Sequence, residues 1–387
     1  MQKFGENESK KGRIVVEKER TITFSKKDSL AVKGIAIIMM IFHHCFIEIP
    51  VLDQYGVSFG ALSREKVVWV CLWLKICVSL FAFVSGYGLY TSYKKKNGSK
   101  VEWVIRRLIK TLSGFWIVFI LAGIVCQLID QRYTRVYFAD GITQGIFSSL
   151  VSFMGLSNLF GMQQLISTWW YMSAAVIFIV MTPFFSGILE KYGRILMLLF
   201  VVIIPRLLNL TYPTEDNAAF GFVFIFIIGM CAAQGDILNH YLEVCQEKIT
   251  GGKKVLLFIA ESVALIVICR WSSGLDVTRF WEICYGITPF LLIVYVQKYL
   301  FKIRPIHTVL EFLGKHSMNI YLVHTFIRNL YLKDVTYSFG YFLWTAVFCL
   351  MSALLISIIL EGLKRLIRYN VWIEWLQEKV CMCLNRK

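Results

Sequence analysis

The sequence predicts an all-α integral membrane protein with about ten transmembrane helices and one re-entrant or protein-buried segment. Its 387 residues are 57% hydrophobic with a mean hydropathy of +0.62, well above the values of soluble globular domains. The apolar residues also fall into runs of roughly 18 to 25 residues, the length that a helix needs to cross the hydrocarbon core. We therefore expect a multi-pass protein of the plasma membrane, with the lipid bilayer as a partner.

Eleven apolar segments have the length and composition of membrane helices. A membrane domain at residues 30–363 contains all of them, between a polar tail at 1–29 and a basic tail at 364–387. The tail at 1–29 has no apolar core and no small-residue cleavage pattern, so we expect no cleaved signal peptide. The expected helices cover residues 30–49, 67–90, 111–129, 142–160, 167–186, 194–210, 218–235, 255–271, 281–296, 317–331 and 341–363.

The distribution of positive charge predicts which of these segments cross. Positively charged loops of multi-pass membrane proteins face the cytoplasm, and the net charge of this chain is +16. If residues 142–160 do not cross, most basic loops and both tails face the cytoplasm, while the loops 211–217, 272–278 and 333–340 face outside. The segment 142–160 is also rich in serine and glycine. We therefore expect ten crossings, both termini in the cytoplasm and no nucleic acid partner.

The eleven cysteines do not indicate a redox or metal site. They are spread through apolar segments without a Cys-x-x-Cys pair. This distribution is typical of small buried hydrophobic residues. We expect no bound metal and no bound cofactor.

The first expected helix carries a lysine and two histidines, and ionisable groups inside membrane helices are costly enough to suggest function. Lys33 and His44 are eleven residues apart, which places them on one helix face with a separation of roughly 16 Å along the axis. Such a pair can hold an anionic substrate at one end and act on its reactive group at the other. His43 points to a different face. The alternative is that Lys33 anchors the helix at the membrane interface and the histidines bond to neighbouring helices.

A basic cluster comes just before the expected helix 111–129. Arg107 and Lys110 are three residues apart and share a helix face, with Arg106 beside them. Because cationic side chains bind phosphate, the cluster is a candidate site for a phosphate-rich donor. The alternative is that these residues only follow the positive-inside rule.

Other candidates are weaker. Trp169, Trp170 and Tyr171 stand at the start of the expected helix 167–186, and aromatic residues at a membrane boundary more often form an interfacial belt than a substrate platform. His324 lies inside the segment 317–331, where a single buried histidine is more often a hydrogen-bonded packing group. We expect the remaining ionisable residues near helices to pair or to extend toward the interface; they are Lys75, Arg206, Glu261, Arg270, Glu282 and Arg328.

These motifs resemble those of the acyltransferase-3 family of bacterial membrane acyltransferases, from about residue 30 to about residue 360. Members open their first helix with an Arg-Gly or Arg-Ala pair and place a histidine after ten intervening residues, a spacing that Lys33 and His44 keep. Members also carry an Arg-x-x-Arg pair after their second helix, which Arg107 and Lys110 match. In both motifs a lysine replaces an arginine. Three further stretches resemble family segments, at 77–89, 168–185 and 312–326.

The resemblance implies an O-acyltransferase in which His44 is catalytic, as a general base or as a transient acyl carrier. The donor is expected to be acyl-CoA, with acetyl-CoA as the expected form. The residues expected to bind it are Lys33, Arg106, Arg107 and Lys110. His43, Trp170, Tyr171 and His324 are expected to contact the acceptor or to support the catalytic group.

The expected acceptor is a hydroxyl group of a surface glycan or of a lipid-linked intermediate in a polysaccharide assembly pathway. Some family members carry a glutamate pair in the helix that starts with the Trp-Tyr motif, where this chain has Ala175 and Val176. We therefore expect that this chain does not use carboxylates at those positions. We also expect no fused esterase-like domain of the kind that many members have.

Two other classes of function fit the same helices. A transporter or flippase for a polysaccharide or lipid-linked substrate also has many helices with polar residues inside them. A non-catalytic scaffold in a polysaccharide-export complex is the third possibility. Turnover of acyl-CoA by the purified protein separates the enzyme from both.

Overall fold

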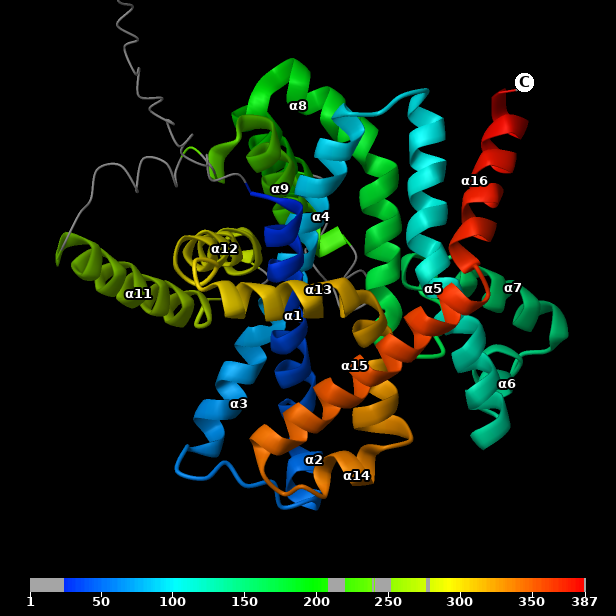
Figure 1. The fold of residues 1–387 in the computed structure, drawn as a ribbon, viewed down its shortest axis with the longest axis horizontal. Coiled ribbons are helices and arrows are strands. Elements are labelled where there is room, and N and C mark those ends of the chain that lie inside the picture. The colour runs from blue at the N-terminus through cyan, green and yellow to red at the C-terminus, as the bar shows by residue number, and fades with distance from the viewer. Residues whose placement is uncertain (1–23, 208–219, 239, 241–251, 276–278, 386–387) are drawn as a thin grey trace, which may run out of the picture.

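The structure, a computed structural model, describes residues 24–207, 220–238, 240, 252–275 and 279–385, and its regular structure there is helical (Figure 1). The first half of the chain forms α1 (Lys26–Phe46), α2 (Ile49–Gln54), α3 (Arg64–Trp73), η1 (Leu74–Ile76), α4 (Cys77–Lys94), α5 (Lys100–Asp130), α6 (Arg132–Tyr137), α7 (Ile142–Phe153), η2 (Asn158–Phe160), η3 (Ser167–Trp170) and α8 (Tyr171–Leu207). The second half forms η5 (Phe220–Phe222), α9 (Val223–Gly235), α11 (Gly252–Ser272), η6 (Ile283–Ile287), α12 (Thr288–Tyr299), α13 (Arg304–Thr325), η7 (Phe326–Leu330), α14 (Lys333–Tyr337), α15 (Phe342–Leu366) and α16 (Tyr369–Asn385).

Each of the eleven expected segments contains helix where the structure describes it. Two of them, 167–186 and 194–210, merge into α8, which bends at Gly193. The φ angle of 79° at this residue is one that glycine adopts without strain. α13 begins at Arg304, well before the expected start at 317, because its first turns are too polar for a hydropathy pattern.

The chain is a polytopic membrane protein. Six helical stretches are long and apolar enough to cross a membrane, among the residues that the structure describes. They are Lys26–Phe46, Arg64–Lys94, Lys100–Asp130, Ser167–Ile204, Gly252–Ser272 and Phe342–Leu366. Shorter apolar helices lie at Ile142–Phe153, Phe220–Gly235 and Ile283–Tyr299. The expected ten crossings also count the second arm of α8 and part of α13, so that number stays a prediction.

The segment 142–160 contains a helix that is too short to cross. α7 has 12 residues, or roughly 18 Å, against a hydrocarbon core of about 30 Å. Protein covers only one side of it, where Gly145 and Ser152 are buried. The other side of α7 is apolar and exposed. The segment is therefore buried by protein only on the face that carries Gly145 and Ser152. The exposed apolar residues are Ile142, Ile146, Phe147, Leu150 and Met154.

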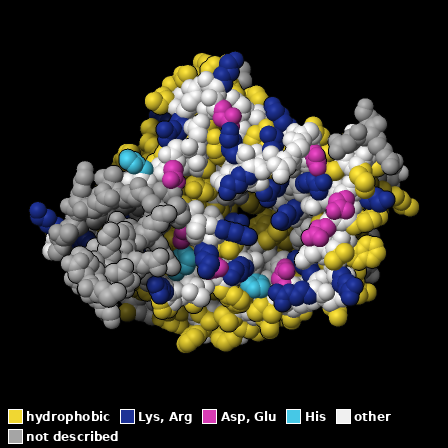
Figure 2. All heavy atoms as spheres, turned by 45° about the horizontal axis from the view of Figure 1, so that its top comes forward, with side chains coloured by type: hydrophobic (Ala, Val, Ile, Leu, Met, Phe, Trp, Pro, Cys, Tyr) yellow, Lys and Arg dark blue, Asp and Glu magenta, His cyan; other side chains and the backbone are white. Residues whose placement is uncertain are grey.

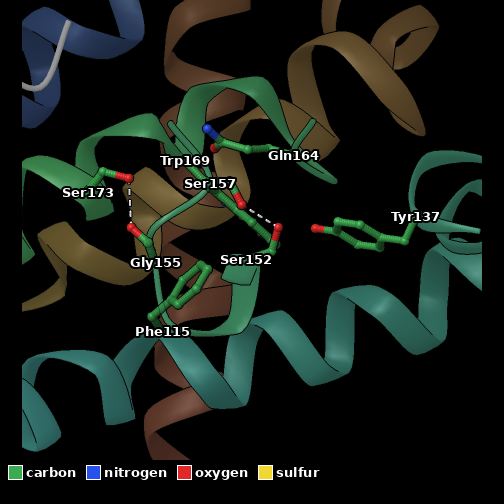
Figure 3. Close-up of a pocket in the computed structure, with 8 residues that line it drawn as sticks. All are labelled: Phe115, Tyr137, Ser152, Gly155, Ser157, Gln164, Trp169 and Ser173. Carbon is green, nitrogen blue, oxygen red and sulfur yellow. Dashed lines mark hydrogen bonds between the residues drawn. The ribbon is translucent and has the colours of Figure 1, made fainter. Parts of the chain in front are cut away.

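A small polar junction ties the end of this segment to α8 (Figure 3). The hydroxyls of Ser152 and Ser157 hydrogen-bond to each other, and Ser173 Oγ donates to the Gly155 carbonyl at 2.7 Å. The pocket between them measures about 10 Å³, which is room for about one water molecule. The serines of this segment are therefore used for structure.

Glycines bring two pairs of helices into backbone contact. A Cβ added to Gly34 or Gly314 would lie within 2.1 Å of a carbonyl oxygen of the facing helix, where α1 crosses α13. Gly86 and Gly229 play the same part between α4 and α9, within 2.2 Å. Close approach of this kind is a common way to pack membrane helices. The first crossing matters for function because α1 and α13 carry the histidines.

Several of the ionisable residues expected to pair do so. Arg206 pairs with Glu282, and Lys298 Nζ lies 2.6 Å from Glu261 Oε1. Arg328 Nη1 lies 2.8 Å from a carboxylate oxygen of Glu48. Arg270 packs over the ring of Trp69 instead.

The two expected tails differ in what the structure describes. Residues 1–23 and the loop 211–217 lie outside the described part of the chain. The expected tail at 364–387 forms the end of α15 and then helix α16, which packs against α5 (Figure 1). Tyr369 Oη donates to the Ser113 carbonyl at 2.8 Å, which fixes the start of α16 on α5.

Candidate active site

A cavity of about 970 Å³ runs between α1, α4, α5, α8 and α13. Figure 2 shows lysine and arginine side chains gathered around a hollow on one face of the molecule. Most of the residues expected to be functional line this one cavity, although they come from three separate parts of the sequence. They are Lys33, His43, His44, Arg107, Lys110, Trp170 and Tyr171.

One part of the cavity is strongly basic. Five cations line it from the start of α1, the end of α4 and the first turns of α5. Among the described residues, none of the five forms an ion pair with a carboxylate, so their charges are left for an anionic ligand. They are Lys26, Lys33, Lys95, Arg107 and Lys110.

Arg107 is held in position by its neighbours. Its guanidinium donates to the hydroxyl of Ser92 and lies 5.8 Å from the ring centroid of Trp103. Trp103 Nε1 in turn donates to Ser92 Oγ at 3.3 Å. These contacts restrict a long side chain before any ligand binds, which lowers the entropic cost of binding.

Arg106 is separated from this group. Its side chain points to Glu102 on the same helix, with 2.9 Å between Nε and Oε1, and it does not line the cavity. Successive residues of a helix are about 100° apart, and at this point of α5 the step turns Arg107 toward the cavity and Arg106 toward Glu102. The two neighbours therefore have different surroundings.

Three imidazole rings form the other part of the site. The ring of His44 lies 4.9 Å from the ring of His43 and 5.0 Å from that of His324, measured between centroids. His43 Nδ1 donates to the Cys71 carbonyl at 2.8 Å, and His324 Nδ1 donates to the Tyr321 carbonyl at 2.7 Å. A carbonyl only accepts, so each of these two rings carries its proton on Nδ1.

His44 differs from its two neighbours. It lines the cavity, and it makes no hydrogen bond within the described part of the chain. Both of its ring nitrogens are thus left for a substrate, whereas His43, which also lines the cavity, uses Nδ1 in its bond to Cys71. His324 is fully buried and does not line the cavity, so it contacts His44 from behind.

The aromatic candidates divide in the same way. Trp170 and Tyr171 line the cavity, and Trp170 stacks on Phe222 with 5.8 Å between centroids. Trp169 is buried and donates through Nε1 to the Leu322 carbonyl at 2.9 Å, so it joins α8 to α13.

Sequence reasoning missed several residues of the cavity. Lys26 and Lys95 were covered only by the general expectation of basic loops, and Tyr321 and Ser92 carry no signal that a single sequence reveals. Lys75 is different, because it is the only Lys, Arg, Asp or Glu between Lys66 and Lys94. That isolation was a signal of function.

Comparison with known proteins identifies the family. No curated protein and no solved structure matches the chain. A family model described as an acyltransferase domain matches residues 31–362, a range that contains the three histidines and most of the cations. The chain therefore belongs to the acyltransferase-3 family, and it is a membrane acyltransferase.

Proposed function

We propose that this acyltransferase takes an acyl group, with acetyl as the expected one, from acyl-CoA on the cytoplasmic side and transfers it to a hydroxyl of a surface glycan or lipid-linked acceptor. The observation that carries the proposal is the cavity, in which cations without an ion pair and an imidazole without a hydrogen bond, as far as the structure describes the chain, share one continuous space. Coenzyme A has the matching shape, since its phosphates are at one end and its thiol is at the other.

The cations fit the phosphate end of this donor. Arg107 and Lys110 are one turn apart on α5, and Lys33 faces the same space from α1. Arginine and lysine bind phosphate oxygens through charge-assisted hydrogen bonds. The cavity volume of about 970 Å³ leaves room for the pantetheine arm to extend from these cations toward His44.

His44 is placed for the chemical step. As a general base, it takes the proton of the acceptor hydroxyl while the hydroxyl oxygen bonds to the thioester carbon. The carbonyl electron pair moves to its oxygen, and the intermediate then collapses as the carbon–sulfur bond breaks. The thiolate leaves with the bonding pair and regains the proton from the imidazolium. In the alternative sequence, His44 first carries the acyl group itself.

The cations on α5 provide the test of donor binding. Arg107→Gln and Lys110→Gln remove charges that line the cavity, so each should raise the Kd for acetyl-CoA about tenfold or more, since hydrogen bonds to charged groups contribute about 1.5–3 kcal/mol. Arg106→Gln is the control, because it removes an adjacent charge that faces Glu102. Isothermal titration of the detergent-purified variants with acetyl-CoA measures all three.

Equal binding by the Arg107 and Lys110 variants and the wild type would show that these residues only orient the helix in the membrane. Transport of a glycan without turnover of acyl-CoA would support the flippase alternative instead. Release of free coenzyme A, followed with a thiol reagent, separates the acyltransferase from the flippase.

A further inference from the structure

Lys75 is a single positive charge in an otherwise uncharged stretch of membrane helix. No other Lys, Arg, Asp or Glu lies between Lys66 and Lys94, and the stretch belongs to the candidate span Arg64–Lys94. A lysine at membrane depth costs several kcal/mol, about 2.5–3.5 on insertion scales. A residue with that cost needs either a structural partner or a function.

Lys75 has no such structural partner in the described part of the chain. Among the described residues it forms no ion pair, whereas the buried lysine of α12, Lys298, has Glu261 at 2.6 Å. Lys75 is exposed and lines the cavity, so its ammonium group faces the space that the donor would occupy.

Lys75 lies at the imidazole part of the cavity. Its charge acts electrostatically on both His43 and His44, whereas the cation that acts on Lys33 is Lys26. The backbone fixes this placement, because the Cys71 carbonyl that accepts the hydrogen bond of His43 belongs to the last turn of α3, directly before η1.

The other cation that acts on the imidazoles is already used. Arg328 Nη1 lies 2.8 Å from Glu48, and neither residue lines the cavity. Among the described residues, Lys75 is therefore the cation that can reach a substrate beside His44.

We propose that Lys75 is a catalytic residue whose ammonium group stabilises the oxyanion of the tetrahedral intermediate, an inference that rests on the proposed acyl transfer. When the acceptor oxygen bonds to the thioester carbon, the carbonyl oxygen gains a full negative charge while His44 takes the proton. A fixed cation beside this oxygen stabilises the transition state more than the uncharged ground state, and so accelerates the step. The charge is lost again when the carbon–sulfur bond breaks.

Lys75→Met is the principal variant, because methionine matches the length of the aliphatic part of lysine and carries no charge. We expect kcat to fall about 100- to 1,000-fold, as for removal of an oxyanion donor, while the Kd for coenzyme A changes by no more than about twofold because the phosphates bind elsewhere. Lys75→Arg should recover part of kcat. Lys95→Met, at the basic part of the same cavity, is the matched comparison and should raise the Kd for coenzyme A by a larger factor than it lowers kcat.

The assays are isothermal titration with coenzyme A and turnover of acetyl-CoA with a saturating glycan acceptor. An unchanged kcat in Lys75→Met would overturn the proposal, and so would a loss of coenzyme A binding equal to the loss of kcat. Lys75→Gln and size-exclusion profiles test folding, and a failure of all three Lys75 variants to fold would assign the residue a structural role. Wild-type protein that binds coenzyme A but never turns over acetyl-CoA would refute the proposed function instead.

Discussion

At the scale of single residues, His44 differs from its two neighbours because neither of its ring nitrogens forms a hydrogen bond with another described residue. His43 and His324 each donate to a backbone carbonyl, and such bonds hold a ring in place. A base or acyl carrier needs an accessible nitrogen. The catalytic role of His44 stays a prediction, and the accessibility of both its ring nitrogens is consistent with it.

Substitution of His44 should abolish the chemistry without affecting donor binding. A neutral amide neither takes a proton nor carries an acyl group, so we expect His44→Gln and His44→Ala to lose activity about 100- to 10,000-fold. O-acylation of the surface glycan, measured beside the membrane level of each variant, tests this. Normal activity of His44→Gln would falsify the catalytic assignment.

His43→Ala is the comparison for that experiment. It removes the bond to Cys71 and leaves a buried carbonyl without its donor, which costs about 1–3 kcal/mol of stability. We therefore expect a less stable protein that retains more activity per folded molecule than His44→Ala. Thermal unfolding in detergent beside the turnover assay separates the two effects.

Part of this site could be predicted from the sequence, and the reason is geometric. Lys33 and His44 belong to one helix, so their spacing alone places them on a common face. The contact between His44 and His324 joins residues on two helices far apart in the sequence, which periodicity cannot reveal. The difference between Arg106 and Arg107 also depends on which face of α5 meets the cavity, and that is set by packing.

At the scale of elements, α13 contacts the helices α1 and α15 and also lines the cavity. Its Gly314 contacts α1 through the backbone, and its Tyr321 lines the cavity. Asn319 Nδ2 donates to Glu361 Oε1 of α15 at 2.9 Å. These demands explain why the segment 312–326 carries small, polar and aromatic residues in close succession.

The crossing of α1 and α13 should not tolerate a methyl group. A Cβ at Gly314 would lie 1.8 Å from the Leu30 carbonyl oxygen, so Gly314→Ala forces the helices apart and costs about 1–3 kcal/mol or more. Because His44 and His324 are on these two helices, kcat should fall together with the melting temperature.

Gly362→Ala on α15 is the control for that variant. No atom lies within 4 Å of its added Cβ, and alanine is favoured over glycine in a helix by about 0.5–1 kcal/mol. The two substitutions should therefore shift the melting temperature in opposite directions. Equal melting temperatures would contradict the tight crossing.

The positions of the helices followed well from hydropathy, because long apolar runs leave a membrane chain few other conformations. The exceptions are instructive. α16 and the first half of α13 are amphipathic or polar, so no apolar run marks them. Two expected segments merge into α8, which continues across the bend at Gly193. From composition alone, this bend cannot be told from a loop between two helices.

At the scale of the whole molecule, the loops gather at two ends. Figure 1 shows α2 and α14 together at the bottom and the bend of α8 at the top. The expected topology puts the first pair outside the cell and the bend in the cytoplasm. This grouping is consistent with the assignment of these loops to opposite sides, because loops on one side of a membrane must lie at one end of the protein; which end faces the cytoplasm stays a prediction.

Cysteine labelling tests the orientation directly. In a cysteine-free background, Ser338→Cys beside α14 should react with a membrane-impermeant maleimide on intact cells, whereas Asn97→Cys between α4 and α5 should not. Both positions are exposed, so accessibility does not bias the comparison. The reverse pattern would place the basic part of the cavity outside and exclude cytoplasmic acyl-CoA as donor.

The ion pair between Arg328 and Glu48 has a consequence for the permeability of the membrane. Glu48 follows His44 by four residues, and Arg328 follows His324 by four residues. The ion pair therefore forms the next layer after the imidazoles in both segments of the chain. Only 6% of the Arg328 side chain is exposed, so removing Glu48 would leave a buried charge without its partner, which is unfavourable. A water-filled cavity of this size would otherwise be a path for protons and small ions. If the proposed function holds, we expect this layer to close the cavity beyond the imidazoles, so that the enzyme can hold a hydrophilic nucleotide within the bilayer without dissipating the ion gradients of the cell.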